Sequence, residues 1–301
     1  MSHPRDWNNT RSRAFLCGLM PAIIVLVAIT VGPAVYLLVT SLTPLNLTRP
    51  ETINDFSAPL ANYSDLASDE RFLNSVWIQA KLSIVTVTLQ VIIGLGLALL
   101  FNTRSSFIGA IRTAFLLPMV LPPIVVAIIW KVLYTPDVSP IHHALAWCGL
   151  PIGSLITNSD TALWAIAVAD SWEWFPFTML MVLAALQMMP AEPIEAAQID
   201  GASRFQIFRF VVLPFLKPTI IVAALFRIID SIKAFPLIYV LTQGGPGDVT
   251  EVTNYFAFLQ AFNFSYWGYA SAIATVMVAA MFVLSWAIMA LSHRGEHAQN
   301  A

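Results

Sequence analysis

The sequence predicts an all-α integral membrane protein with six transmembrane helices. Its composition is 58% hydrophobic and only 11% charged over 301 residues, which lies outside the range of soluble proteins. Its apolar runs are long enough to cross a bilayer, and its basic residues gather in alternate loops. We expect one transmembrane domain covering residues 1–301. A net charge of −2 without any basic run argues against nucleic-acid binding.

Each expected span is an apolar segment between polar loops. The first is too long for the hydrophobic core of a secretory signal peptide, so it is interpreted as a membrane helix. The third contains three prolines, which predict a kinked or broken helix facing the bundle interior. The second carries Gly94 and Ala98 at a spacing that allows close helix packing, although ordinary lipid-facing packing explains it equally. The expected spans are 14–42, 72–101, 111–133, 161–189, 219–241 and 266–291.

The basic residues predict the orientation. If the N-terminus is cytoplasmic, nearly all of the basic residues outside the spans lie inside, as the positive-inside rule requires, and only Arg49 and Arg71 lie outside. Both termini and the loop 190–218 are then cytoplasmic. The inside residues are Arg5, Arg11, Arg13, Arg104, Arg112, Arg204, Arg209, Lys217 and Arg294.

The loop 190–218 is the long polar interruption that carries a pattern. Proline suits a helix start, so a short helix is expected to begin near Pro193. Gly201 is expected to end it, since glycine adopts the left-handed conformation without penalty. Ala196 and Ala197 leave a smooth surface between these ends that can enter a groove of another protein.

A second short helix is expected over 204–212, closed by Pro214 and Pro218. These prolines should return the chain to the fifth span.

Besides Arg112 at the edge of the third span, seven charged residues lie inside expected spans, where each costs a few kcal/mol unless it faces a cavity or a partner. Arg227, Asp230 and Lys233 recur at every third position, which allows two ion pairs along one helix face. A structural ion-pair ladder, a contact with a sister subunit and a substrate path all remain open. The other four are Lys81, Lys131, Asp170 and Glu173.

The fourth span contains the segment Ser-Trp-Glu-Trp-Phe-Pro-Phe at 171–177. Aromatic faces beside hydrogen-bond acceptors suit sugar recognition, although membrane packing of aromatics is the alternative. Residues two apart on a helix point about 200 degrees apart, so at most one of Trp172 and Trp174 lines a path unless Pro176 distorts the turn. We expect this helix to contribute more to solute passage than the fifth. Its candidates are Trp172, Glu173, Trp174 and Phe177.

Three segments resemble one protein family. The Glu195-Ala196-Ala197 triplet, Gly201 and the segment 211–214 resemble the EAA loop of permease subunits in binding-protein-dependent ABC importers, with Val211 replacing the usual Ile. The segments 171–177 and 226–248 are similar to those of the carbohydrate-type group, which includes maltose, glycerol-phosphate and polyol importers. The resemblance extends over most of the chain and implies a type I ABC importer permease fold in a bacterial inner membrane.

The resemblance also implies the partners. A second permease would form a heterodimer with this chain, two ATPase subunits would bind ATP and Mg, and an extracytoplasmic solute-binding protein would deliver a sugar or sugar-like solute. This chain would hold no catalytic residue, metal or cofactor of its own, and it contains no G-x-x-x-x-G-K-[ST] loop. ATPase coupling is assigned to Glu195, Ala196, Ala197, Asp200 and Gly201. Binding-protein contact is assigned to the outer turn, at Gly244, Gly245, Pro246 and Asp248.

Two other classes compete with this interpretation. A secondary transporter for a polar solute would explain the intramembrane charges but would require internal repeats. An intramembrane enzyme would require a nucleophile with a base or metal ligands, yet the histidines are expected in termini and loops. The sequence does not distinguish among a neutral sugar, a polyol, and a sugar phosphate or sulfonate as the solute.

Overall fold

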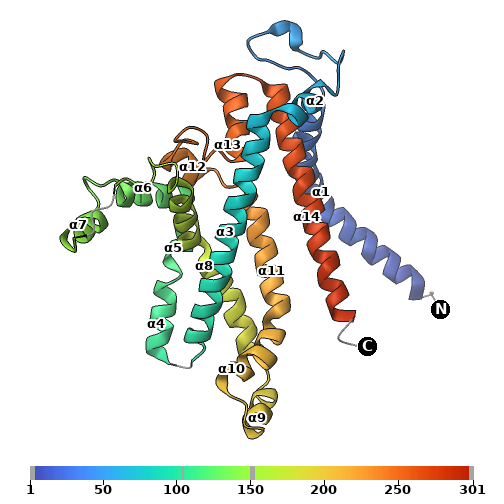
Figure 1. Ribbon diagram of the computed structural model, residues 1–301. Helices are drawn as coiled ribbons and strands as arrows, with labels where there is room; N and C mark the ends of the chain where they lie inside the picture. The colour runs from blue at the N-terminus through green and yellow to red at the C-terminus, as the bar shows by residue number, and fades with distance from the viewer. Residues whose placement is uncertain (1–3, 104, 150–152, 298–301) are drawn as a thin grey trace. The chain divides into compact units, whose positions relative to one another are not determined.

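The computed structural model describes residues 4–103, 105–149 and 153–297, and the regular elements in these ranges are helices (Figure 1). Five helical segments there are long and apolar enough to cross a membrane, which confirms the expected all-α membrane class. They are Gly18–Ser41 in α1 (Pro4–Ser41), α3 (Glu70–Phe101), α8 (Ala162–Met188), Arg204–Ile232, and Trp267–Ile288 in α14 (Trp267–His297).

The third expected span, 111–133, is broken into short helices, as its prolines predict. The pieces are α4 (Ser106–Ala114), α5 (Leu117–Val120) and α6 (Pro123–Tyr134). Prolines occupy the first turns of α5 and α6, where the missing N–H group costs no helical hydrogen bond. The third expected span is therefore present as a set of helices rather than one long helix.

The boundaries expected for the fifth span, 219–241, are wrong at both ends. Pro218 does not close a helix: α10 (Arg204–Ile207), a π-helical turn (Phe208–Val212) and α11 (Leu213–Ile232) run on continuously. The widened π turn lies just before Pro214 and accommodates the lost donor. At the other end α11 stops at Ile232, because a residue preceding a proline disfavours helical geometry and Phe235 precedes Pro236. Lys233 therefore caps α11 instead of lying inside a span.

Contacts divide the chain into two compact units. The smaller comprises the segments up to Ser68 and Leu259–Val276, and the larger comprises Asp69–Phe258 with the segment from Met277 onward. In the smaller unit the Asn62 side chain donates to the carbonyl oxygens of Ser41 and Thr43 at 2.9 and 2.8 Å. The stretch expected as a plain loop after the first span contains a 3₁₀ turn (Pro50–Thr52) and α2 (Ala61–Ser68).

In the larger unit α3, α8 and α11 run side by side (Figure 1). A Cβ atom at Gly94 would lie 2.8 Å from Thr178 Cβ and 2.9 Å from the Met179 backbone nitrogen. The helices α3 and α8 can therefore approach this closely because Gly94 has no side chain. Ala98, one turn further along α3, is fully buried. Of the two alternatives left open for this pair of small residues, the structure shows close helix packing.

Several short helices complete the described chain. His142 lies in one of them, α7, and is buried there, so the expectation that it lies in a plain loop is wrong. The short helices are α7 (Pro140–Trp147), α9 (Glu192–Ile199), α12 (Pro236–Leu241), α13 (Thr253–Phe258) and a π turn (Leu259–Asn263).

Candidate functional site

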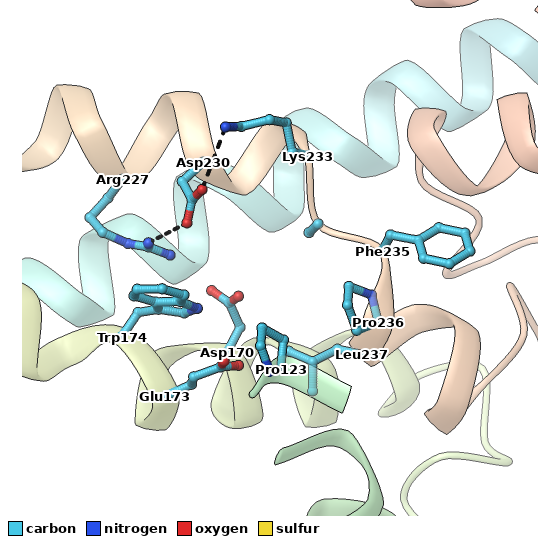
Figure 2. A pocket seen from close by; sticks show the side chains of 11 residues that line it. Pro123, Asp170, Glu173, Trp174, Arg227, Asp230, Lys233, Phe235, Pro236 and Leu237 are labelled. Carbon is cyan, nitrogen blue, oxygen red and sulfur yellow. Dashed lines mark hydrogen bonds and ion pairs between the residues drawn. The ribbon is translucent and has the colours of Figure 1, made fainter. Parts of the chain in front are cut away.

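A cavity of about 140 Å³ lies within the larger unit, between α8, the end of α11 and the start of α12 (Figure 2). This volume accommodates several water molecules. Five charged residues line it beside an apolar wall. The charged residues are Asp170, Glu173, Arg227, Asp230 and Lys233, and the apolar wall includes Pro123, Trp174, Phe235, Pro236 and Leu237.

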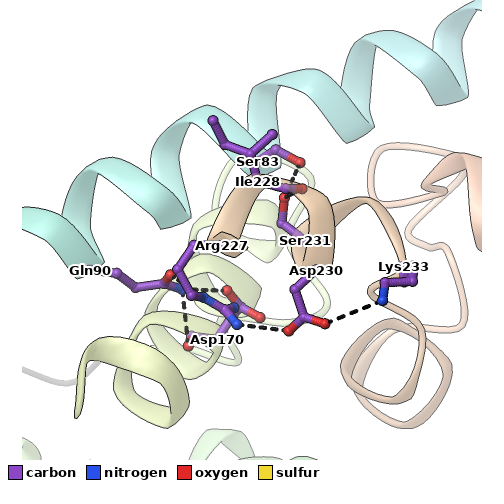
Figure 3. Close-up of polar contacts among 8 residues, drawn as sticks. All are labelled: Ser83, Gln90, Asp170, Arg227, Ile228, Asp230, Ser231 and Lys233. Carbon is purple, nitrogen blue, oxygen red and sulfur yellow. Dashed lines mark hydrogen bonds and ion pairs between the residues drawn. The ribbon is translucent and has the colours of Figure 1, made fainter. Parts of the chain in front are cut away.

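Arg227 is held from three directions. Its Nε donates to Gln90 Oε1 at 2.8 Å, and its Nη1 donates to Asp230 Oδ2 at 2.7 Å (Figure 3). Its guanidinium carbon lies 4.3 Å from the centre of the Trp174 ring, a cation–π contact. The Arg227 side chain is only 4% exposed. A buried guanidinium with this set of partners is a fixed structural charge rather than a mobile one.

Gln90 joins three helices and was not identified from the sequence. Its amide accepts from Arg227 on α11 and donates from Nε2 to Asp170 Oδ2 on α8 at 2.8 Å. It belongs to a buried polar stripe on α3, at 79, 83, 86 and 90, whose spacings of four, three and four residues place these side chains on one helix face. That periodicity within an apolar helix was the available signal.

Two other residues of this stripe on α3 form hydrogen bonds with the end of α11. Ser231 Oγ donates to Ser83 Oγ at 2.8 Å, and the Gln79 side chain donates to the Ser231 carbonyl oxygen at 3.0 Å. These bonds fix α11 against α3 next to the cavity.

Glu173 differs from the other carboxylates of the cavity. The residue is 1% exposed, and its Oε1 atom is buried without a hydrogen-bond partner among the described residues. Asp170, one turn earlier on α8, has its Oδ2 satisfied by Gln90. A buried carboxylate oxygen requires a donor, so Glu173 presents an acceptor to whatever occupies the cavity.

Both ion pairs expected from the spacing form at the end of α11. Asp230 accepts from Arg227 and lies 3.7 Å from Lys233 Nζ. The Lys233 side chain is 58% exposed, so its contact with Asp230 is a weak one. The charged stripe thus runs from a buried, tightly held cation to an exposed one.

Two of the candidate aromatics lie away from the cavity lining. Trp172 packs edge-to-face on Trp130 with 5.9 Å between ring centres, and Phe177 packs on Phe226 at 6.3 Å. Trp174 is the tryptophan of the pair that borders the cavity. A contact of Trp172 or Trp174 with solute stays a prediction.

The segment expected to couple to an ATPase forms a short exposed helix. No residue of α9 is buried, and Ile199 at its end is 86% exposed. Gly201 follows with φ +77°, the left-handed conformation expected of it. Ser203 then starts α10 with a capping box formed with Gln206. The coupling candidates therefore share one solvent-facing element; they are Glu195, Ala196, Ala197, Asp200 and Gly201.

The outer turn is a tightly bonded loop. The Thr250 backbone donates to the Gly244 carbonyl oxygen at 3.1 Å, and its hydroxyl donates to the Gly245 carbonyl oxygen at 2.8 Å. Gly244 has φ +84°, and a Cβ there would lie 3.0 Å from the Tyr255 ring. Pro246 follows Gly245 in this bonded turn. Gly244 is thus required by backbone geometry and close packing.

Two side-chain contacts tie this turn to the start of α3. Arg71 donates through Nε and Nη2 to the buried Glu251 carboxylate at 2.8 and 2.7 Å, and Asn74 donates to Asp248 at 3.2 Å. The bidentate pair was not predicted, because its members are far apart in the sequence. Burial raises the pKa of the neighbouring Tyr255, and the Glu251 carboxylate adds to the shift. Within the described residues, no cluster of His, Cys, Asp and Glu is arranged to hold a metal ion.

A family model, described as the binding-protein-dependent transport system inner membrane component, matches residues 90–296. This chain belongs to that family. It is a multi-pass inner membrane permease subunit of an ABC transporter, and the match includes α8, α9, α11 and the outer turn. The site described above therefore lies within the part of the chain that matches the family.

The similarity of this chain to curated permeases extends over most of its length. It is 35% identical over 267 residues to a probable ABC transporter permease of Sinorhizobium fredii, covering 88% of this chain and 85% of that protein. It is 37% identical over 232 residues to the trehalose/maltose transport system permease of Thermococcus litoralis, covering 77% and 78%. It is 33% identical over 263 residues to the sulfoquinovosyl glycerol transport system permease of Agrobacterium fabrum, covering 87% and 84%.

A solved structure shows the same fold. The permease fold matches a chain of a bacterial ABC transporter involved in the import of the acidic polysaccharide alginate, with a TM-score of 0.82 and 21% identity. The match covers 96% of this chain and 99% of that chain.

Proposed function

We propose that this chain is one of two permease subunits of a carbohydrate importer driven by ATP hydrolysis in two partner subunits. The named relatives support a carbohydrate solute, since they serve trehalose/maltose and sulfoquinovosyl glycerol transport. A structure of the alginate transporter in complex with a pentasaccharide-bound periplasmic protein supports delivery by a solute-binding protein. The second permease and the ATPase subunits follow from membership of the family.

The observation that carries coupling is the exposure of α9. This eight-residue helix has no fully buried side chain, and its Ile194 and Ala197 are only partly buried against the core, so it gains limited stability from its own chain, since short helices depend on tertiary packing. Docking into a groove of an ATPase subunit would supply that packing. The small side chains of Ala196 and Ala197 allow such a groove to approach the helix backbone closely.

The membrane orientation follows from the basic residues. We place both termini and α9 in the cytoplasm, as the positive-inside rule requires, and the outer turn on the opposite face. Asp248 is then exposed toward the solute-binding protein, with Gly244, Gly245 and Pro246 shaping the contact surface. The Arg71–Glu251 pair holds that surface to α3.

The cavity is proposed as part of the solute path. It lies between two membrane helices, α8 and α11, and it combines fixed charges with an aromatic and proline wall. Such a mixture of a few placed polar groups and apolar surface is typical of small-molecule sites. Lys233 and Phe235 border it where α11 gives way to α12.

The experiment is uptake in proteoliposomes that contain this chain with its co-purified permease and ATPase subunits and the binding protein outside. We expect accumulation of radiolabelled carbohydrate that requires both ATP and the binding protein. Uptake that persists without the ATPase subunits and follows an ion gradient would instead assign a secondary transporter. Omission of the binding protein alone serves as the control for leak.

A further inference from the structure

We propose that Glu173 accepts a hydrogen bond from a hydroxyl group of a neutral carbohydrate, and that the cavity around it disfavours anionic sugars. This inference rests on the proposed function and narrows the solute class. It excludes sugar phosphates, sulfonates and uronates as preferred occupants. Four observations on the cavity carry it.

The first observation is the charge of the lining. Three carboxylates, of Asp170, Glu173 and Asp230, face two cations, of Arg227 and Lys233, which leaves a formal charge of −1. The count already includes the exposed Lys233 as a full charge. An anionic group entering the cavity would therefore meet a lining in which carboxyl groups outnumber cations, which disfavours it.

The second observation is that Arg227 is already occupied. Its Nε and Nη1 donate to Gln90 and Asp230, and its flat face covers Trp174. A solute anion that approached this guanidinium would compete with the Asp230 carboxylate that is already paired with it. The strongest cation of the cavity thus serves the protein's own carboxylates.

The third observation is the free acceptor. Glu173 is almost fully buried, and its Oε1 atom has no partner among the described residues, whereas Asp170 is bonded to Gln90. A carboxylate accepts hydrogen bonds and cannot donate them while ionised, so its natural complement is a hydroxyl donor. Water can donate there between transport cycles, and a sugar hydroxyl can replace it.

The fourth observation is the apolar wall opposite the carboxylates. Pro123, Phe235 and Pro236 border the same cavity (Figure 2). A pyranose ring presents C–H groups on its faces and hydroxyls around its rim. Such a ring fits a cavity with an apolar wall and a single free acceptor, whereas a strongly hydrated anion does not.

The test places a cysteine in the lining. Ala234 borders the cavity and is half-buried, so Ala234→Cys is made in a chain carrying Cys17→Ser and Cys148→Ser, and the whole transporter is purified. Its reaction rate is measured with a cationic and an anionic methanethiosulfonate reagent. A chain that carries only Cys17→Ser, and so keeps the exposed Cys148, gives the reference ratio.

We expect the cationic-to-anionic rate ratio at position 234 to exceed the reference by about fivefold or more, because the lining is negative. Glu173→Gln, which keeps the shape and removes the charge, should lower this ratio. Asp160→Asn, at an exposed outer carboxylate, should leave it unchanged. A ratio at or below the reference in the unaltered cavity would overturn the inference without requiring any Glu173 variant to assemble.

The solute class is tested by protection of the same cysteine. Millimolar trehalose or maltose should slow labelling, whereas trehalose 6-phosphate, which has the same skeleton and an added charge, should not. Glu173→Leu should abolish protection, and Glu173→Gln should retain part of it because an amide oxygen still accepts. Equal or better protection by the phosphate, or protection by none of these sugars, contradicts the inference. ATP-dependent uptake by the same transporter would show that the proposed function nevertheless stands.

Discussion

The cavity and α9 are both polar, yet they are stabilised in opposite ways. The cavity's charges are bonded by side chains from three helices, with Arg227 and Gln90 almost completely buried. The helix α9 has no buried residue. The charge of Arg227 is paired within this chain, whereas most side chains of α9 are exposed. Substitutions in the first region should therefore change stability, and substitutions in the second should change coupling.

The largest expected effect is at Arg227. Arg227→Met leaves three carboxylates around the cavity without their buried cation, and removal of one partner of a buried pair costs about 3 kcal/mol. We expect a large loss of assembled transporter, measured by size-exclusion chromatography of a fluorescent fusion. Arg227→Lys keeps the charge and should lose less.

Asp230→Asn provides the matched comparison for the other half of the pair. The Asp230 side chain is 43% exposed, and Arg227 retains Gln90 and Trp174 when it is changed. The loss of assembled transporter should be smaller than for Arg227→Met. Equal losses would show that the network around Arg227 does not hold the charge as described.

The next effect is at Gln90. Gln90→Leu removes the acceptor for Arg227 and the donor to Asp170, and stranding buried polar groups costs about 2 kcal/mol. Thermal unfolding of the purified transporter should shift down accordingly. Gln79→Leu is the control on the same face of α3, and it should cost less because Gln79 Oε1 has no partner to lose. A larger loss at Gln79 would contradict the central place given to Gln90.

A smaller effect is expected at the α3–α8 contact. Gly94→Ala pushes a methyl group against the α8 backbone and should cost about 1–2 kcal/mol, as overpacking does. Gly96→Ala, two residues along the same helix, meets no atom within 4 Å and should be neutral or slightly stabilising. Thermal unfolding of the two variants side by side measures the difference, and identical curves would rule out the close approach.

The effect expected at Gly201 is on coupling more than on stability. A valine there meets no neighbouring atom, but it must adopt φ +77°, which costs a β-branched residue about 1–2 kcal/mol locally. Assembly should be nearly normal while ATP-driven uptake falls strongly. Gly201→Asn, which tolerates the left-handed conformation, should retain most uptake. Full uptake with valine would mean that the turn after α9 plays no part in coupling.

The two regions also differ in how far the sequence predicted them. The helix α9 and its glycine cap follow from local rules on proline, alanine and glycine, because this element has few packing partners in its own chain to override them: Ile194 and Ala197 are only partly buried. The Arg227–Asp230 and Asp230–Lys233 pairs were predictable for the same reason, since they join neighbours on one helix.

The rest of the cavity depends on contacts between distant segments. Gln90 and Arg227 are 137 positions apart, and Arg71 and Glu251 are 180 apart, so spacing within one helix could not reveal either pair. The end of the fifth span was wrong because its apolar run continues past the break that Pro236 imposes. Hydrophobicity predicts that a segment is buried in the membrane, but the position of a break depends on backbone geometry.

The most direct measurement of this account is a pair of cross-linking experiments in a chain without its native cysteines. Ala196→Cys on α9 should cross-link to an ATPase subunit, and Asp248→Cys on the outer turn should cross-link to the solute-binding protein, each identified by mass spectrometry. Both sites are exposed, so neither change should disturb folding. Capture of the ATPase from position 248, or of neither partner from position 196 in a transporter that still imports solute, would contradict the assignment of α9 as the coupling element.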